Sequence, residues 1–116
     1  MKHHRKITKL SREKGQREAL VVSLANALII SDKMKTTEAK AKAIRPFIER
    51  LVTKAKANSL ASRRLVLSRL KNETSVKKLF TTIAPKYATR AGGYVRIIKL
   101  PVRKSDGAMM AHIEFV

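Results

Sequence analysis

The sequence predicts an α+β fold in which about four helices pack on one face of a small antiparallel sheet, with a basic N-terminal arm. Apolar residues recur at helical spacing through most of residues 13–87. After Gly92 and Gly93 the spacing changes to the alternation typical of strands. Residues 1–12 contain five Lys or Arg and no acid, which predicts an arm in front of a single domain at 13–116.

The first helix is expected to follow Ser11, a favourable N-cap residue, with Glu13 in the first turn. Helical spacing continues to about Ile30, where the polar pair at 31–32 ends the pattern. Residues 33–36 then alternate as a short strand does. The apolar stripe of this helix consists of Leu20, Val21, Leu24, Ala27 and Leu28.

A second helix is expected after Thr37, whose hydroxyl can accept a bond from a first-turn N–H group. Pro46 lies inside this helix and cannot donate to the Lys42 carbonyl, so we expect a kink there. The apolar stripe contains Ala43, Ile44, Phe47, Ile48, Leu51, Val52 and Ala55.

Two shorter helices complete the helical part of the chain. Asn58 and Ser59 break the second helix and offer a cap for a third of about three turns, ending near Leu70. The fourth is expected to begin near Thr74 or Ser75, and Pro85 limits its regular bonding. The buried side of the fourth helix is expected to hold Val76, Leu79, Phe80, Ile83 and Tyr87.

A β-hairpin is predicted for the C-terminal residues. Residues 94–100 are rich in β-branched side chains, and the turn residues at 105–107 precede a second alternating segment. The face of that last strand expected to be buried consists of Met109, Ala111, Ile113 and Phe115, whereas Met110, His112 and Glu114 alternate with it. The aromatic residues expected to pack in the core, rather than to stack on bases, are Phe47, Phe80 and Phe115.

The charge balance indicates an anionic partner. The chain of 116 residues has 27 Lys and Arg against 8 Asp and Glu, a formal net charge of +19. A folded surface with this excess repels itself unless a polyanion lies against it, and the sequence pI near 11.1 favours nucleic acid. No apolar run approaches the ~20 residues that span a bilayer, so we expect no membrane partner. With no cysteine, disulfides and thiolate metal sites are excluded.

The residues that could perform catalysis are few and scattered. His3 and His4 lie on the arm and His112 on the last strand, without carboxylates spaced for metal binding. The eight acids form no close pair suited to acid–base chemistry, and neither glycine-rich phosphate-loop frame is present. We therefore expect no enzyme activity, no metal, no cofactor and no small-molecule substrate.

Two clusters are candidates for phosphate contact. Arg63 and Arg64 are neighbours on a helix, about 100° apart, so they can straddle two phosphates. A solvated charged face is the alternative, but few acids are available to pair with it, so RNA contact is favoured. Arg90 precedes Gly92 and Gly93, which allow a close backbone approach to a sugar-phosphate strand but are explained equally well by a structural turn.

Several sequence blocks, in this order, resemble one protein family. They are Lys2-His3-His4-Arg5-Lys6, Lys9-Leu10-Ser11-Arg12, Lys35-Thr36-Thr37, Lys40-Ala41-Lys42, Arg63-Arg64, Val76-Lys77-Lys78-Leu79-Phe80, Tyr87-Ala88-Thr89-Arg90-Ala91-Gly92-Gly93-Tyr94 and Met110-Ala111-His112-Ile113-Glu114-Phe115-Val116. In this register the chain is similar to the bacterial large-subunit ribosomal protein L17 family from Met1 to Val116.

The resemblance implies a structural constituent of the large ribosomal subunit that binds rRNA near the nascent-chain exit, among neighbouring large-subunit proteins. It implies a cytoplasmic ribosome, with an organellar ribosome as the alternative. The alternative function, equally suited to the charge, is a basic DNA-compacting architectural protein. Charge and resemblance together predict rRNA contacts by Lys2, His3, His4, Arg5, Lys6, Lys9, Arg12, Arg17, Lys35, Lys40, Lys42, Arg63, Arg64, Arg90, Gly92, Gly93, Tyr94 and Arg96.

Overall fold

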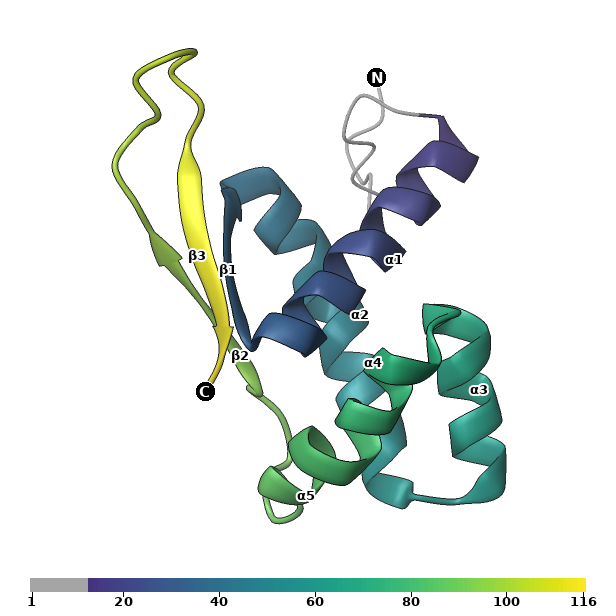
Figure 1. The fold of residues 1–116 in the computed structure, drawn as a ribbon. Coiled ribbons are helices and arrows are strands. Elements are labelled where there is room, and N and C mark those ends of the chain that lie inside the picture. The colour runs from purple at the N-terminus through teal and green to yellow at the C-terminus, as the bar shows by residue number, and fades with distance from the viewer. Residues whose placement is uncertain (1–12) are drawn as a thin grey trace, which may run out of the picture.

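The computed structural model describes residues 13–116 and has the α+β architecture that the sequence predicts (Figure 1). The predicted arm at 1–12 and the predicted cap at Ser11 lie outside the described residues. In chain order the elements are α1 (Lys14–Ser31), β1 (Lys33–Thr37), α2 (Glu38–Ala57), α3 (Leu60–Leu70), α4 (Glu73–Lys78), a π-helical turn η1 (Leu79–Ile83), α5 (Ala84–Lys86), β2 (Val95–Lys99) and β3 (Met110–Phe115).

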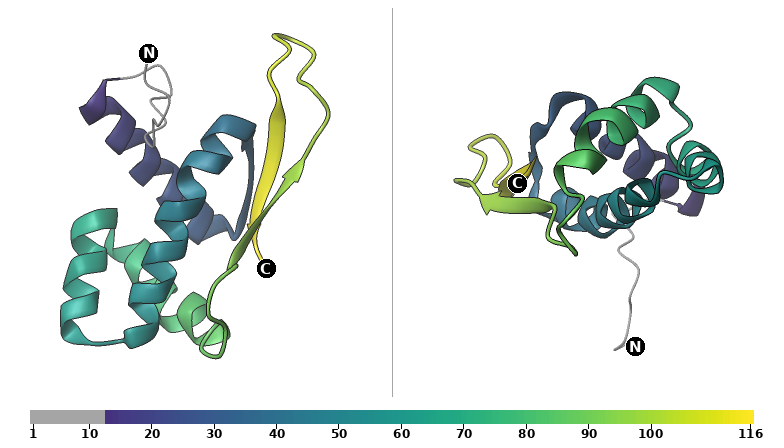
Figure 2. Two further views of the ribbon diagram at one scale, coloured as in Figure 1. Left: turned by 180° about the vertical axis from the view of Figure 1, so that it is seen from behind. Right: turned by 90° about the horizontal axis from the view of Figure 1, so that it is seen from below.

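The sheet is antiparallel, with strand order β1-β3-β2, so the last strand is central. Met34 of β1 and Ile97 of β2 both lie opposite Ile113 of β3. All described helices lie on one side of this sheet, as the views in Figure 2 show. The face that carries Ile113 packs against them, and the other face is open.

Helix α1 begins at Lys14, with Glu13 as its N-cap rather than in its first turn. It ends where Asp32 adopts a left-handed conformation (φ 68°) and donates its backbone N–H to the Leu28 carbonyl at 2.7 Å. The predicted stripe is partly wrong, because Ala27 is exposed and Ala25 and Ile29 are buried instead. Helix α1 contacts α2, α3, α4 and β1, so its buried surface is broader than one stripe.

Helix α2 is the longest helix and contacts all three strands. The Thr37 hydroxyl accepts a bond from the Lys40 N–H group at 3.3 Å, which confirms the predicted cap. Helical structure continues from Glu38 to Ala57 through Pro46, which lies on the exposed side. Its buried residues include the predicted Ile44, Ile48, Leu51, Val52 and Ala55.

Side-chain caps fix the start of the next two helices. Ser59 and Ser62 form a capping box at the start of α3. Asn72 accepts from the Ser75 N–H group at 3.1 Å, so α4 begins at Glu73, slightly before the predicted start.

The π-helical turn η1 was not predicted. The backbone N–H of Ala84 donates to the Leu79 carbonyl, five residues earlier, directly before Pro85, which has no N–H to donate. The apolar spacing of residues 76–87 is compatible with either an α or a π turn, so it does not separate the two.

The hairpin differs from the prediction at two methionines. Met109 is 60% exposed because it lies in the loop before β3, where the alternation of the strand does not apply. Met110 was expected to face outward but is 8% exposed, since its central strand is flanked by Thr37 on one side and Leu100 on the other. The prediction of core packing is confirmed for Phe80, which is buried, whereas Phe47 and Phe115 pack against the core but remain half-buried.

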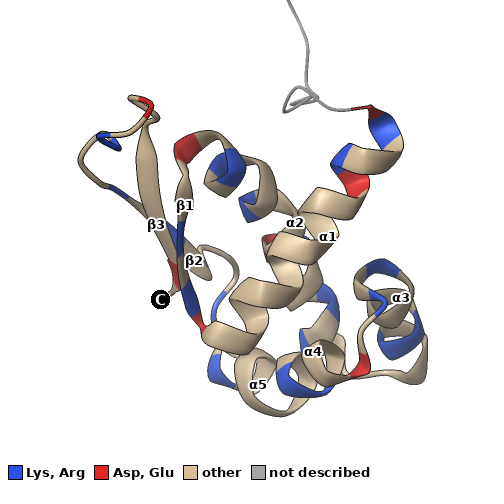
Figure 3. Ribbon diagram, turned by 45° about the horizontal axis from the view of Figure 1, so that its top comes forward, with Lys and Arg blue, Asp and Glu red and all other residues tan. Residues whose placement is uncertain are grey.

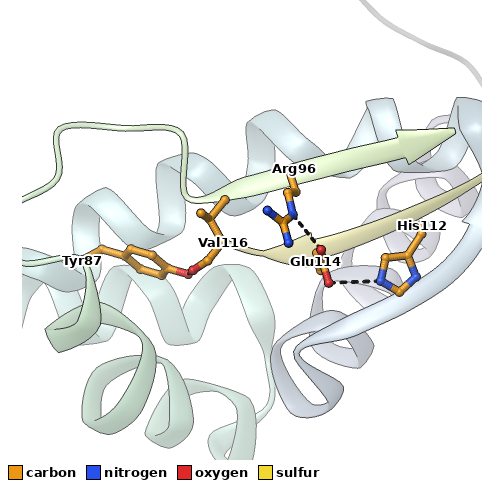
Figure 4. Close-up of polar contacts among 5 residues, drawn as sticks. All are labelled: Tyr87, Arg96, His112, Glu114 and Val116. Carbon is orange, nitrogen blue, oxygen red and sulfur yellow. Dashed lines mark hydrogen bonds and ion pairs between the residues drawn. The ribbon is translucent and has the colours of Figure 1, made fainter.

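The C-terminus is joined to the end of the helical region by Tyr87. Its hydroxyl donates to the Val116 carbonyl at 2.6 Å (Figure 4). The Tyr87 ring centroid lies 5.3 Å from that of Tyr94 and 6.4 Å from that of Phe115. Burial raises the pKa of Tyr87, which keeps its hydroxyl protonated as a donor.

Replacing an isoleucine with alanine should lower the free energy of unfolding by different amounts on the two faces of the sheet. Ile113→Ala removes a fully buried side chain between sheet and helices and should lower the free energy of unfolding by about 2–5 kcal/mol. Ile98, on the open face, is 44% exposed, so Ile98→Ala should cost less than about 1 kcal/mol. Urea unfolding of both variants measures the difference, and equal losses would contradict the assignment of faces.

Candidate nucleic-acid interface

Few of the basic side chains have a carboxylate partner. Within residues 13–116, ion pairs within 4.0 Å involve Lys42, Lys78, Arg96, Lys99 and Arg103, together with one His–Glu contact. The remaining described Lys and Arg lie on every helix longer than one turn and on the sheet, as the blue segments of Figure 3 show. The described surface is therefore cationic on several faces, with little internal neutralisation.

The loop at 90–94 is fixed against α2 by three polar residues spaced along one face of that helix. The Glu49 carboxylate accepts the Tyr94 backbone N–H at 3.3 Å. The Thr53 hydroxyl lies 3.3 Å from the Tyr94 hydroxyl. Lys56 donates from Nζ to the Tyr94 hydroxyl at 3.1 Å and also to the Arg90 carbonyl.

The buried end of this loop is Tyr94, which is only 1% exposed. Its hydroxyl donates to the Arg90 carbonyl at 3.2 Å, and Lys56 lies 5.2 Å from its ring centroid. Hydrogen bonding with Thr53 and then with Lys56 lowers the pKa of Tyr94. The Tyr94 side chain is thus a support for the loop, while the side chain of Arg90 is exposed.

Of the two glycines in the loop, Gly93 needs its lack of a side chain. It has φ +64°, a left-handed conformation that glycine adopts without strain. A Cβ atom at this position would meet nothing within 4 Å, so the requirement comes from the backbone conformation and not from crowding. This favours the structural-turn interpretation for Gly93 and leaves its surroundings open to a partner.

The arginine pair lies on α3, away from the loop. The Arg63 guanidinium carbon is 5.0 Å from the ring centroid of Phe80, which holds it over the α4–η1 region. Arg64 is exposed, as Arg63 is, and neither has a carboxylate partner in the described part of the chain. Both guanidinium groups are therefore available to a ligand.

The open face of the sheet carries a charged cluster around Glu114 (Figure 4). Arg96 Nε donates to Glu114 Oε1 at 2.6 Å, and His112 Nε2 lies 3.3 Å from Glu114 Oε2. Hydrogen bonding by Arg96, the larger effect, and by His112 lowers the pKa of Glu114. Lys35 lies opposite His112 in the strand register and is exposed.

The other described candidates lie on two different helices. Lys42 pairs with Glu38 at 2.9 Å, which lowers the pKa of that carboxylate. Lys40 is half-buried beside the α2 cap, and Arg17 is half-buried near the start of α1. The structure does not gather the predicted residues at one spot but places them on separate surfaces. The arm candidates outside the described residues are Lys2, His3, His4, Arg5, Lys6, Lys9 and Arg12.

Sequence reasoning missed the residues of α2 that hold the loop. Glu49, Thr53 and Lys56 recur at intervals of four and three residues, which places them on one face of a helix. That spacing indicates a shared polar face of the helix. It does not identify what this face binds, because the loop that these residues hold lies about forty residues further along the chain.

The described residues contain neither a membrane-spanning helix nor a metal-binding cluster. No helix from residue 13 onward combines the length and the apolar character needed to cross a bilayer. The same residues contain no group of three or more His, Cys, Asp or Glu placed to hold a metal ion.

Comparison with known proteins gives one consistent result. The model of the family described as Ribosomal protein L17 matches residues 20–116. The chain is 51% identical to a protein of Hydrogenobaculum sp. and 50% identical to one of Neorickettsia sennetsu. It is 53% identical to a protein of Persephonella marina. These alignments cover 100% of this chain and 99%, 100% and 95% of the relatives, each named "Large ribosomal subunit protein bL17".

The Glu114 cluster predicts a pH-dependent contribution to stability. Because the folded-state pKa lies below the usual 4.5, ionised Glu114 stabilises the fold above about pH 4.5, and this contribution is lost as the pH falls through the folded-state pKa. Glu114→Gln should therefore be less stable than the unsubstituted chain near neutral pH, with the difference vanishing on acidification. Urea unfolding across this range tests it.

The control for this experiment is Glu18→Gln, which removes the same charge from an exposed residue without an ion pair among the described residues. A difference between Glu114→Gln and the unsubstituted chain that stays constant with pH would contradict the role of ionised Glu114.

Proposed function

Because this chain belongs to the ribosomal protein L17 family, we propose that it is a structural constituent of the large ribosomal subunit that binds and stabilises rRNA. The proposed contacts are made by Lys and Arg to the phosphate backbone. The proposed site is near the nascent-chain exit, among neighbouring large-subunit proteins, in cytoplasmic ribosomes.

This proposal rests on the similarity of the chain to large-subunit ribosomal proteins, combined with its excess of positive charge. Relatives named as large ribosomal subunit proteins match the full length of the chain at about half identity. The chain has a net charge of +19, and most of its described basic side chains have no carboxylate partner. Phosphates supply the missing negative charge, and the release of their counterions favours binding.

The distribution of the cations favours structured RNA over a flat anionic surface. Arg63 and Arg64 on α3, Arg90 beside the α2-supported loop and Lys35 on the open sheet lie on different elements. An RNA that folds around the protein can meet all these surfaces together. Since side chains do not read the deep major groove of A-form helices, specificity is expected from RNA shape and 2′-hydroxyl contacts.

The N-terminal arm is proposed to bind in the same way. Residues 2–12 carry five Lys or Arg and two His without an acid. A groove in folded RNA would supply the negative charge that such a segment lacks. In this proposal the arm adds affinity for RNA and little to the stability of residues 13–116.

Salt dependence and competition test the proposed ligand. If about 6–10 phosphates are neutralised, log K should fall with log salt at a slope of roughly −5 to −9 on a duplex. A structured fragment of large-subunit rRNA should compete better than duplex DNA of equal length at matched salt. Equal competition would favour the DNA-compacting alternative, and a slope near zero would contradict phosphate binding altogether.

Deletion of residues 2–12 tests the arm. The shortened chain should enter large subunits less well in cells, measured by sedimentation of extracts through sucrose gradients. Its thermal unfolding in the free state should change little, because the arm is not expected to belong to the core. A large fall in the unfolding temperature would show that the arm is part of the folded domain.

A further inference from the structure

A groove of about 1100 Å³ lies between α1, α2 and the C-terminal end of α3. On α2 its lining includes Ala43, Pro46 and Phe47, and on α1 it includes Ala19 and Val22. These positions recur at three or four residues along each helix, so each helix gives one continuous wall. We name this feature the three-helix groove.

A hydrogen bond joins two walls of the three-helix groove. Asn26 of α1 donates from Nδ2 to the carbonyl of Leu70, the last residue of α3, at 3.0 Å. Both residues line the groove. The end of α3 is thereby fixed relative to α1, and the groove is formed before any ligand binds.

The lining combines half-buried apolar and amide side chains with charged ones, among which basic residues outnumber the single acid, Glu18. Val22, Ala43 and Phe47 are half-buried, whereas the lining cations Arg50, Arg69 and Lys71 are exposed. None of these three cations has an ion pair within residues 13–116. In Figure 3 the basic segments of α3 and of the start of α1 border the region between these helices.

This combination matches the chemistry of an unpaired nucleotide. A base offers an apolar face that packs on aromatic and aliphatic side chains, and its phosphates carry the charge that exposed arginines bind. In a duplex the base faces are stacked on one another and cannot reach Phe47.

We propose that the three-helix groove binds an unpaired segment of RNA, with a base against Pro46 and Phe47 and the flanking phosphates on Arg50, Arg69 and Lys71. This inference rests on the proposed rRNA-binding function and adds which form of RNA binds where. An acidic peptide would also meet these cations. Unpaired RNA is favoured because the unneutralised charge continues beyond the groove onto the other faces, as a continuing chain of phosphates requires.

The test blocks the groove without changing its charge. Ala19 and Ser23 are exposed residues of α1 that line the groove one turn apart, so the double variant Ala19→Leu, Ser23→Leu fills it with aliphatic volume. The matched control is Ala27→Leu, Ala39→Leu, at exposed positions on α1 and α2 outside the lining. Circular dichroism melting checks that both variants are folded.

Two probes of equal length are used with the full chain. One is a single-stranded RNA of about 12 nucleotides containing 4-thiouridine, within the roughly 4–16 nucleotides of known single-strand sites. The other is a blunt RNA duplex. The groove variant should bind the single strand about tenfold more weakly than the control variant while binding the duplex equally well. Photocrosslinks in the unsubstituted chain should map to residues 19–26 or 43–50.

Other outcomes separate the two proposals. Unchanged single-strand binding by the groove variant, or crosslinks only outside the groove, would overturn the inference but leave rRNA binding intact. An equal loss for a polyglutamate peptide would show that the groove is a general anion site and would overturn base insertion. If the unsubstituted chain bound neither RNA, the proposed function itself would fail.

Discussion

The folded state must be stable despite electrostatic repulsion among its basic side chains, and the rest of the structure depends on this constraint. A chain with 27 Lys and Arg and 8 Asp and Glu cannot neutralise its own surface, so the folded state depends on burying apolar area. The core does this with one continuous cluster that joins the helices to one face of the sheet. Helix α2 lies at its centre, since it contacts all three strands as well as α1 and α3.

Four of the described carboxylates are placed where elements meet. Asp32, at the end of α1, pairs with Lys78 of α4 at 3.1 Å. Glu38, at the start of α2, contacts Lys99 at the end of β2, and Glu49 accepts the backbone N–H of Tyr94. Glu114 joins β3 to β2 through Arg96. These carboxylates join neighbouring elements of the fold through ion pairs and hydrogen bonds. The basic side chains elsewhere remain available to an external anion.

At the tip of the β2–β3 hairpin, too, a carboxylate pairs with a basic side chain. Arg103 donates two bonds to Asp106, at 2.8 and 2.6 Å, and the Ala108 N–H adds a third. Hydrogen bonding by Arg103 and then by Ala108 lowers the pKa of Asp106 to about 2. The carboxylate therefore stays ionised well into the acid range and shapes the turn, and Met109 and Val102 nearby are exposed.

The sequence by itself determined the properties that depend on neighbours along the chain. Spacing located the helices and strands, Thr37 and Ser59 were identified as caps, and the fourth helix begins within about two residues of its expected start. Charge counting identified a polyanion as the expected partner, and Arg63, Arg64 and Arg90 lie on the surface as that interpretation requires.

Only the tertiary structure decided the properties that depend on residues far apart in sequence. It placed Tyr94 in the core because α2 supplies its hydrogen-bond partners, and it exposed Met109 because the strand begins one residue later. It also formed the three-helix groove, whose walls are joined by Asn26 and Leu70. Periodicity shows which side of an element is apolar, but it cannot show which other element covers that side, because that is settled by packing.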